Sequence, residues 1–161
     1  WNGANLGFTF RPESRFRLDQ TYIFSRLGTR DGSTPAGFSP GTNIFNNHLL
    51  RSKLNYQFTR ELSLRLILDY NATLANPGLV NLQRNLGSFA GGPIPPTKAF
   101  TSDILFTYLL HPGTAVYLGY SDAYGNLQLD NTLVPPIVSR GAPDTSIGRL
   151  FFVKVSYLFR Y

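Results

Sequence analysis

The 161-residue sequence contains no cysteine. This absence excludes disulfide bonds and thiolate chemistry, and with them the small secreted folds that disulfides hold together. No run of 18 apolar residues occurs, so the sequence predicts no transmembrane helix. No signal peptide is visible, and an exported protein would carry its signal upstream of Trp1.

Long clusters of one charge sign are also missing. The formal net charge is +6, but no run of five Lys or Arg residues exists. Neither a zinc-finger spacing nor an aromatic RNA-binding motif is present, so we do not expect nucleic acid as a partner. Basic groups that face lipopolysaccharide or line a pore would explain the positive sign equally well.

What the sequence does contain is alternation, in a chain with 14% aromatic residues. Apolar side chains occupy every second position of segments 16–24, 50–59, 62–71, 100–110, 115–121 and 150–161. These positions are even in the first five segments and odd in the last, and only Gln20, Ser52 and Ser102 among them are clearly polar. Such a period of two predicts β-strands, and residues 6–10 continue the even phase.

The two faces of these strands differ in chemistry. Charged side chains avoid the apolar positions, and a charge facing lipid at mid-depth costs about 2–4 kcal/mol for Arg or Lys. The predicted lipid-facing residues are Leu54, Tyr56, Phe58, Leu64, Leu66, Leu68, Phe106, Val153 and Val155. The predicted lumen-facing residues are Arg17, Asp19, Arg51, Lys53, Arg65, Asp69, Asp103 and Lys154, which either line a pore or form cross-strand pairs that plug it.

Short and long connections alternate along the chain. We expect strands near residues 5–11, 16–27, 45–59, 62–73, 99–110, 114–123 and 148–161. Short turns lie at 11–15, 59–61 and 111–113, where Gly113 supplies a positive φ, and long loops cover 28–44, 74–98 and 124–147. Long strands with short periplasmic turns and long extracellular loops are typical of outer-membrane barrels.

The predicted fold class is therefore all-β, an antiparallel transmembrane β-barrel formed by residues 1–161 as one segment. Seven strands is an odd number, whereas bacterial single-chain barrels have even numbers. We expect the C-terminal portion of a larger barrel, or a barrel that other chains complete; a different use of residues 1–10 would give eight strands. A soluble β-sandwich, whose core is the alternating apolar face, stays an alternative.

The last eleven residues, Phe151–Tyr161, resemble the C-terminal strand signal that the barrel-insertion machinery reads. That signal is an alternating apolar strand with a terminal aromatic residue. The resemblance implies that Tyr157, Phe159 and Tyr161 serve as the insertion signal and that Tyr161 is a natural C-terminus.

Three runs, Leu54–Asn71, Phe100–Tyr120 and Phe151–Arg160, resemble a family of large outer-membrane proteins from acidobacteria, Bacteroidetes and their relatives. Members of that family carry an N-terminal carbohydrate-binding-like domain and a C-terminal barrel, and they are often labelled membrane-associated hydrolases. The likeness covers about residues 45–161, so this chain resembles the barrel part, and it brings no catalytic motif to these residues.

Catalytic and metal-binding signals are weak. His111 lies in a predicted turn and His48 at the outer end of a strand, so the two are not expected to share a metal. Asp122, Asn126, Asp130 and Asn131 fall in a predicted outward loop but match no defined calcium spacing. We find no catalytic motif and expect no cofactor and no metal.

The sequence thus predicts an integral protein of the bacterial outer membrane that acts as a channel, a transporter component or an anchor for an attached domain. The alternatives are a structural subunit of a larger envelope assembly and a membrane-associated hydrolase. Expected partners are outer-membrane lipid and lipopolysaccharide, the insertion machinery, and upstream strands or other envelope subunits.

Overall fold

The computed structural model describes residues 1–161 apart from 80–81, 83–96, 112, 130, 133–136 and 159–161, and only the backbone of 137–139. Seven long antiparallel strands form one sheet: β1 (Asn2–Glu13), β2 (Phe16–Gly28), β3 (Asn43–Gln57), β4 (Leu62–Ala75), β5 (Thr97–His111), β6 (Thr114–Gly125) and β9 (Thr145–Tyr157). A separate hairpin pairs β7 (Leu127–Leu129) with β8 (Ile137–Ser139). In this described part, no helix is both long and apolar enough to cross a membrane.

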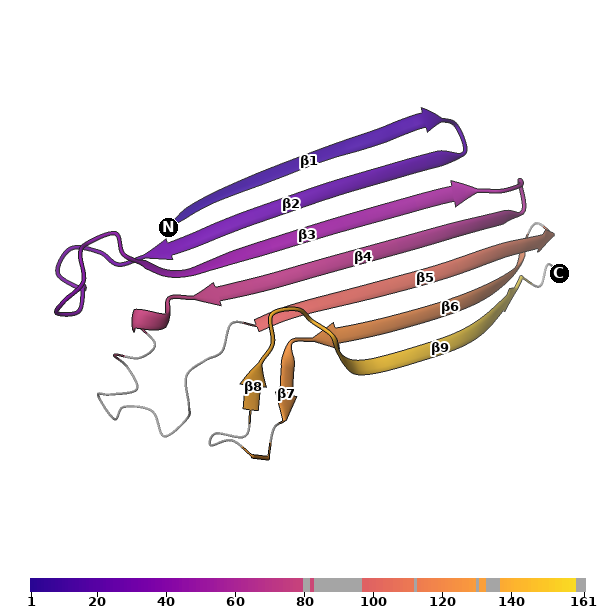
Figure 1. The fold of residues 1–161 in the computed structure, drawn as a ribbon. Helices are drawn as coiled ribbons and strands as arrows, with labels where there is room; N and C mark the ends of the chain where they lie inside the picture. Colours follow the sequence, from indigo (N-terminus) through magenta and orange to yellow (C-terminus); the bar gives the residue numbers. More distant parts are fainter. Residues whose placement is uncertain (80–81, 83–96, 112, 130, 133–136, 159–161) are drawn as a thin grey trace.

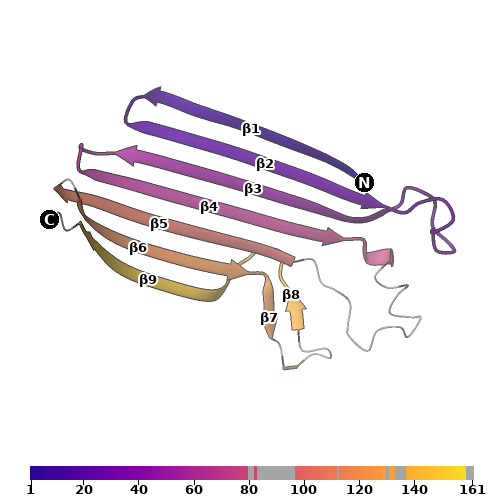
Figure 2. The ribbon, with the colours of Figure 1, turned by 180° about the vertical axis from the view of Figure 1, so that it is seen from behind.

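The sheet is a meander in which each long strand pairs with the next along the chain (Figure 1). Its order is β1-β2-β3-β4-β5-β6-β9, so β1 and β9 form the two edges. The view from behind shows the same order, with the β7–β8 hairpin beyond the end of β6 (Figure 2). The sheet is open because no pairing joins β1 to β9 among the described residues.

The connections alternate as expected, with short turns at one end of the sheet and long connections at the other (Figure 1). Gly113 has a φ of 100°, so the predicted left-handed glycine in the turn between β5 and β6 is confirmed. Strand β1 extends through Glu13 with an irregularity between Phe10 and Glu13, so the first turn is shorter than the expected 11–15. The predicted loop 124–147 contains the hairpin, and β9 begins within it at Thr145.

Strand register joins the alternating patterns into two continuous faces. Even residues pair with even residues from β1 to β6, as in Leu54 with Leu66 and Leu66 with Ile104. Between β6 and β9 even residues pair with odd ones, as in Leu118 with Val153, which matches the change of phase in the last segment. Because successive residues point to opposite faces, this register places every apolar row on the same side.

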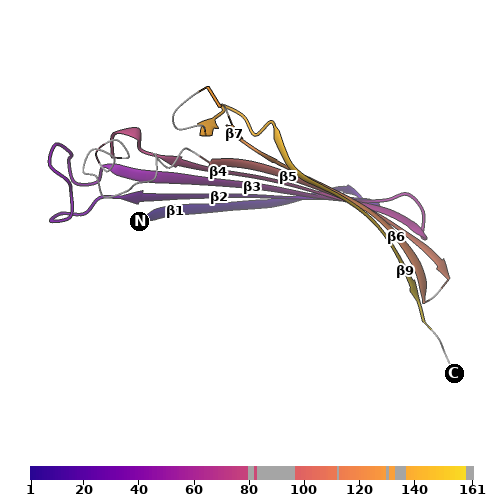
Figure 3. The ribbon, with the colours of Figure 1, turned by 90° about the horizontal axis from the view of Figure 1, so that it is seen from below.

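The sheet is a single curved layer from which the β7–β8 hairpin stands off near one end (Figure 3). Among the described residues, only Ala72 and Ala115 are buried hydrophobic side chains. Large apolar side chains remain open on the even face, with Phe8 62% exposed and Val155 66% exposed. The β-sandwich alternative requires a second sheet packed on this face, and no such sheet exists in the described part of the chain.

Candidate functional site

The eight predicted lumen residues lie together on one face of the sheet, which we call the polar face. It comprises the odd positions of β1–β6 and the even positions of β9. The register places Asn55 between Arg17 and Arg65, Asp19 next to Lys53, and Arg51 next to Asp69. Asp103 and Lys154 extend this face into β5 and β9. Residues that are 137 positions apart in sequence therefore share one surface.

Arg51 and Asp69 form the best-defined ion pair of the polar face. The Nε atom of Arg51 donates to Oδ1 of Asp69 at 2.6 Å, and Nη2 donates to Oδ2 at 3.0 Å. Such a two-point contact fixes both side chains across the β3–β4 pair. The side chains are 45% and 24% exposed, and an exposed pair contributes about 0–1 kcal/mol. The pair therefore orders the face without being its main source of stability.

A second cluster surrounds Asp19 on β2. The Nε atom of Arg17 donates to both carboxylate oxygens of Asp19, at 2.7 Å and 2.9 Å, and the hydroxyl of Thr9 donates to Oδ1 at 2.7 Å. These contacts join β1 to β2 on the polar face and occupy the carboxylate. Both carboxylate oxygens of Asp19 therefore already accept hydrogen bonds.

The remaining predicted polar residues form weaker contacts or none. The hydroxyl of Ser121 donates to Asp103 at 2.5 Å. The Nζ atom of Lys154 lies 5.8 Å from the ring centre of Tyr117, a cation–π contact. Lys53 and Arg65 form no ion pair with any described residue. Positive charge is thus less compensated than negative charge on this face.

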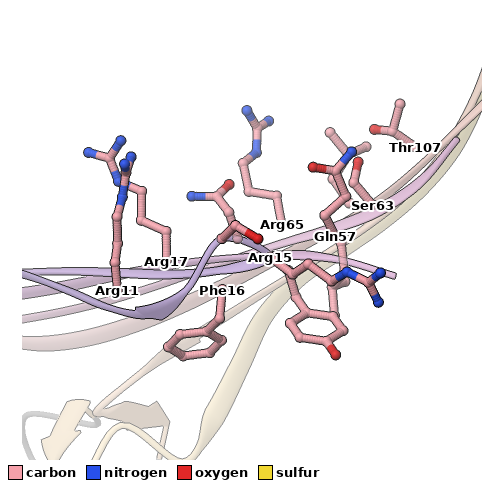
Figure 4. A pocket seen from close by; sticks show the side chains of 13 residues that line it. Arg11, Arg15, Phe16, Arg17, Gln57, Ser63, Arg65 and Thr107 are labelled. Carbon is pink, nitrogen blue, oxygen red and sulfur yellow. The ribbon is translucent and has the colours of Figure 1, made fainter. Parts of the chain in front are cut away.

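An open hollow of about 410 Å³ lies on the sheet near the short turns. We call it the basic hollow, and its lining contains four arginines with amide, hydroxyl and apolar neighbours: Arg11, Ser14, Arg15, Phe16, Arg17, Asn55, Tyr56, Gln57, Ser63, Leu64, Arg65, Leu105 and Thr107. Arg11, Arg17 and Arg65 project to the same side of the sheet, away from Phe16 (Figure 4).

Sequence reasoning identified Arg17 and Arg65 of this hollow but missed Arg11 and Arg15. Both were assigned to the expected turn 11–15, where alternation gives no facing. The extension of β1 through Glu13 places Arg11 in the strand instead. Odd residues of β1 share a face with Thr9, so this alternation could have placed Arg11 on the polar face. The alternation gives no facing for Arg15, which lies in the turn.

The predicted lipid-facing residues lie on the opposite face, which we call the apolar face. By register, Leu54, Tyr56, Leu64, Leu66, Leu68, Phe106, Val153 and Val155 all share it. Phe58 is different, because β3 ends at Gln57 and Phe58 belongs to the turn, where its N–H donates to the carbonyl of Leu62. Tyr157 ends β9 on the apolar face, whereas Phe159 and Tyr161 lie outside the described residues.

One row of the apolar face is largely polar. Gln20, Ser52 and Ser102, the three exceptions to the alternation, fall in a single row across the sheet, in which Leu68 lies between the two serines. The row continues through Asp122 to Arg149. Ser52 donates to the side chain of Gln20 at 2.7 Å. The register, which no single strand reveals, brings these residues together.

Asp122 was placed in a loop by the sequence interpretation, but it lies within β6 and is 5% exposed. The hydroxyls of Tyr120 and Tyr124 donate to its Oδ2 at 2.9 Å and 2.7 Å, and Nε of Arg149 lies 3.4 Å from the same atom. Three groups thus share Oδ2, whereas Oδ1 is buried and has no hydrogen-bond partner among the described residues. Asn126 is also buried and accepts from the N–H of Lys98, while Asp130 lies outside the described residues.

The two histidines stand far apart. Nδ1 of His48 lies 2.8 Å from the hydroxyl of Tyr22, toward the end of β3 that carries the long connections. His111 ends β5 at the short-turn end. Within the described residues, no three His, Asp or Glu side chains come close enough to hold a metal ion.

The geometry thus presents a charged face with a basic hollow, an apolar face without a covering layer, and two open edges. No protein-family model, no curated protein and no solved structure matches this chain.

Proposed function

We propose that this chain is part of the wall of a transmembrane β-barrel in the bacterial outer membrane, with the apolar face against lipid and the polar face toward a water-filled lumen. In this role it serves as a channel, a transporter component or a membrane anchor. The observation that carries the proposal is the two-faced single layer, in which long strands expose apolar side chains on one side and most of the charges on the other. Exceptions such as Asp122 and Arg149 lie near the long connections and pair with each other.

The exposed apolar face indicates that this sheet is not stable alone in water. Burying one large apolar side chain contributes about 1.5–3 kcal/mol to stability. Leucine, phenylalanine, tyrosine and valine side chains on this face remain exposed and do not gain that contribution. A membrane supplies it without a second protein layer. The alternation from Leu62 to Tyr70 in β4 covers nine residues, within the range of about 9–11 residues that a tilted membrane strand needs.

The open edges support completion by further strands. In an antiparallel meander of seven strands, β1 and β9 run in the same direction, so closing the sheet on itself would require a parallel pair. One additional strand, or any odd number of them, restores antiparallel pairing throughout. We propose that upstream strands of a longer protein supply them. The same open edges favour the alternative of a structural subunit that other envelope chains complete.

Kinship with the outer-membrane family that carries an N-terminal carbohydrate-binding-like domain is part of the proposal, on the likeness of Leu54–Asn71, Phe100–Tyr120 and Phe151–Arg160. The hydrolase alternative is less favoured, because the sequence contains no catalytic motif that we can identify. The insertion machinery and lipopolysaccharide are the partners that this location would require.

The decisive experiment exchanges charge and apolarity on two adjacent residues of β4. Leu66 lies on the apolar face and Arg65 on the polar face, so Leu66→Arg should place a guanidinium in lipid at a cost of about 2–4 kcal/mol. Arg65→Leu should be tolerated, because it adds an apolar group to a face that also contains Ile67 and Leu105. The measurement is the fraction of chain that assembles in the outer membrane and resists extraction.

The two variants control for each other, since they alter neighbouring positions of the same strand. Equal loss of assembly for Leu66→Arg and Arg65→Leu would refute the assigned facing. Normal assembly of both variants would refute the proposal that the apolar face contacts lipid.

A further inference from the structure

The basic hollow carries more positive charge than its surroundings compensate. Four arginines line it and no Asp or Glu does. Arg17 is paired with Asp19, but Arg11, Arg15 and Arg65 form no ion pair with any described residue. Like charges gathered on one wall repel one another, so an anion seated among them would lower the energy of the site.

We propose that the basic hollow is a binding site for a phosphate-type oxyanion, on the polar face near the short turns. The guanidinium group has five N–H donors in a planar fork, and this fork matches the spacing of oxygens on phosphate and carboxylate. Arg11 on β1 and Arg65 on β4 approach the hollow from strands that β2 and β3 separate. An anion held by both would therefore lie above the sheet between them, on the side to which both side chains project (Figure 4).

The neutral residues of the hollow suit the same ligand. Gln57 on β3 and Thr107 on β5 contribute an amide and a hydroxyl to the lining. Both groups can donate to an oxyanion once the arginines have neutralised its charge. A cation would meet only repulsion here, and an uncharged sugar would leave the arginines uncompensated. An anion with a tetrahedral arrangement of oxygens uses donors from several strands at once.

The ion pair of Arg17 with Asp19 gives the hollow a fixed boundary. Because Asp19 also accepts from Thr9, the Arg17 side chain is held toward β1 and does not need the ligand for its position. Arg15 does not project with the other three arginines (Figure 4). Arg11 and Arg65 lack such a restraint among the described residues and are the groups left to contact an anion. The proposal assigns binding to them.

This inference rests on the proposed function in one respect, which is that the polar face must be open to water. If the polar face is the lumen, the site lies at the mouth formed by the short turns and would gather phosphate-bearing solutes at that end. Phosphate could come from a free solute or from a lipid headgroup, and the same guanidinium forks would recognise both.

The test uses the full chain in detergent micelles and inorganic phosphate as the probe, with ionic strength held constant by chloride. Titration calorimetry should show saturable binding to the unsubstituted chain. The double variant Arg11→Gln with Arg65→Gln should weaken it by about tenfold or more, because each arginine removes charge-assisted hydrogen bonds. Lys53→Gln is the matched control, since it removes one positive charge from the same face outside the hollow, and it should change affinity by less than about twofold.

Absence of saturable phosphate binding would overturn the inference, as would an equal loss in the Lys53→Gln control. A parallel titration with micelles that contain a phosphate-headgroup lipid separates the two sources: competition by the lipid assigns a headgroup, and undisturbed phosphate binding assigns a free solute. Membrane assembly of the unsubstituted chain is measured separately. A chain that assembles but does not bind phosphate refutes this inference alone, whereas a chain that fails to assemble refutes the proposed function.

Discussion

At the residue scale, Gly119 in β6 shows how a single missing side chain shapes the sheet. Gly119 pairs with Phe152 of β9, and a Cβ built on Gly119 would overlap the ring of Phe152. The ring therefore lies over the glycine backbone on the polar face. Glycine in a strand interior normally weakens it, but an aromatic ring across the pair covers the exposed backbone and restores contact.

We expect Gly119→Ala to destabilise the sheet by about 1–3 kcal/mol, since the added methyl group forces the ring of Phe152 away. Gly7→Ala is the matched control, because the nearest atom to a Cβ there is the carbonyl oxygen of Gln20 at 3.6 Å. Urea unfolding of the chain in micelles measures both. The penalty of Gly119→Ala should shrink when Phe152→Ala is also present, since the clash is then gone; an unchanged penalty would show that the ring is not its cause.

At the element scale, the turn between β5 and β6 depends on Gly113 for two separate reasons. Its φ of 100° lies in a region that residues with a side chain rarely adopt, and a Cβ there would lie 2.9 Å from Cβ of Leu158. The N–H of Leu158 donates to the carbonyl of Gly113 at 2.8 Å. The residue after β9 is thus attached to the turn, which joins three strands at this end.

Gly113→Ala should therefore cost more than backbone strain alone, which is about 1–3 kcal/mol for a left-handed non-glycine residue. Gly32→Ala separates the two contributions, because Gly32 has a φ of 77° but nothing within 4 Å of its Cβ position. Thermal unfolding of the two variants in micelles gives the comparison. A smaller loss for Gly113→Ala than for Gly32→Ala would contradict the role of the Leu158 contact.

At the scale of the whole molecule, the direction of the edge strands limits how the sheet can close. Because β1 and β9 run in the same direction, seven strands alone leave no antiparallel closure. The chain has no cysteine, so introduced pairs report proximity without background. A disulfide forms only when the two Cα atoms lie about 4.4–6.8 Å apart.

We expect no intrachain disulfide in variants that combine Thr9→Cys on β1 with Leu150→Cys, Phe152→Cys or Lys154→Cys on β9. Ala115→Cys with Ser156→Cys is the positive control, because these residues are partners across β6 and β9 and should link after oxidation. Non-reducing gel mobility of the membrane-assembled chain reads out both results. An intrachain link between β1 and β9 would show that seven strands close on themselves, and it would remove the need for upstream strands.

The sequence by itself determined the local conformation and the two faces of each strand. Side chains of a strand alternate between its two faces. In a run such as Leu62–Tyr70 the leucines therefore lie on one face, and Arg65 and Asp69 lie on the other. Glycine and proline in the long connections ended the strands, so most strand bounds were predictable to within two or three residues. Neither the β7–β8 hairpin nor the extension of β1 was predicted, since their short runs carry too little alternation.

Only the tertiary structure decided which residues meet across strands. Register depends on the pairing of whole strands, so only the register placed Gln20, Ser52, Ser102, Asp122 and Arg149 in one row, with Leu68 between the two serines. In the same way it brought Arg11 of β1 and Arg65 of β4 to one hollow. A sequence pattern states the facing of a side chain within its own strand. The hydrogen bonds between paired strands determine which side chains become its neighbours. A shift of the register by one residue would give each side chain different neighbours.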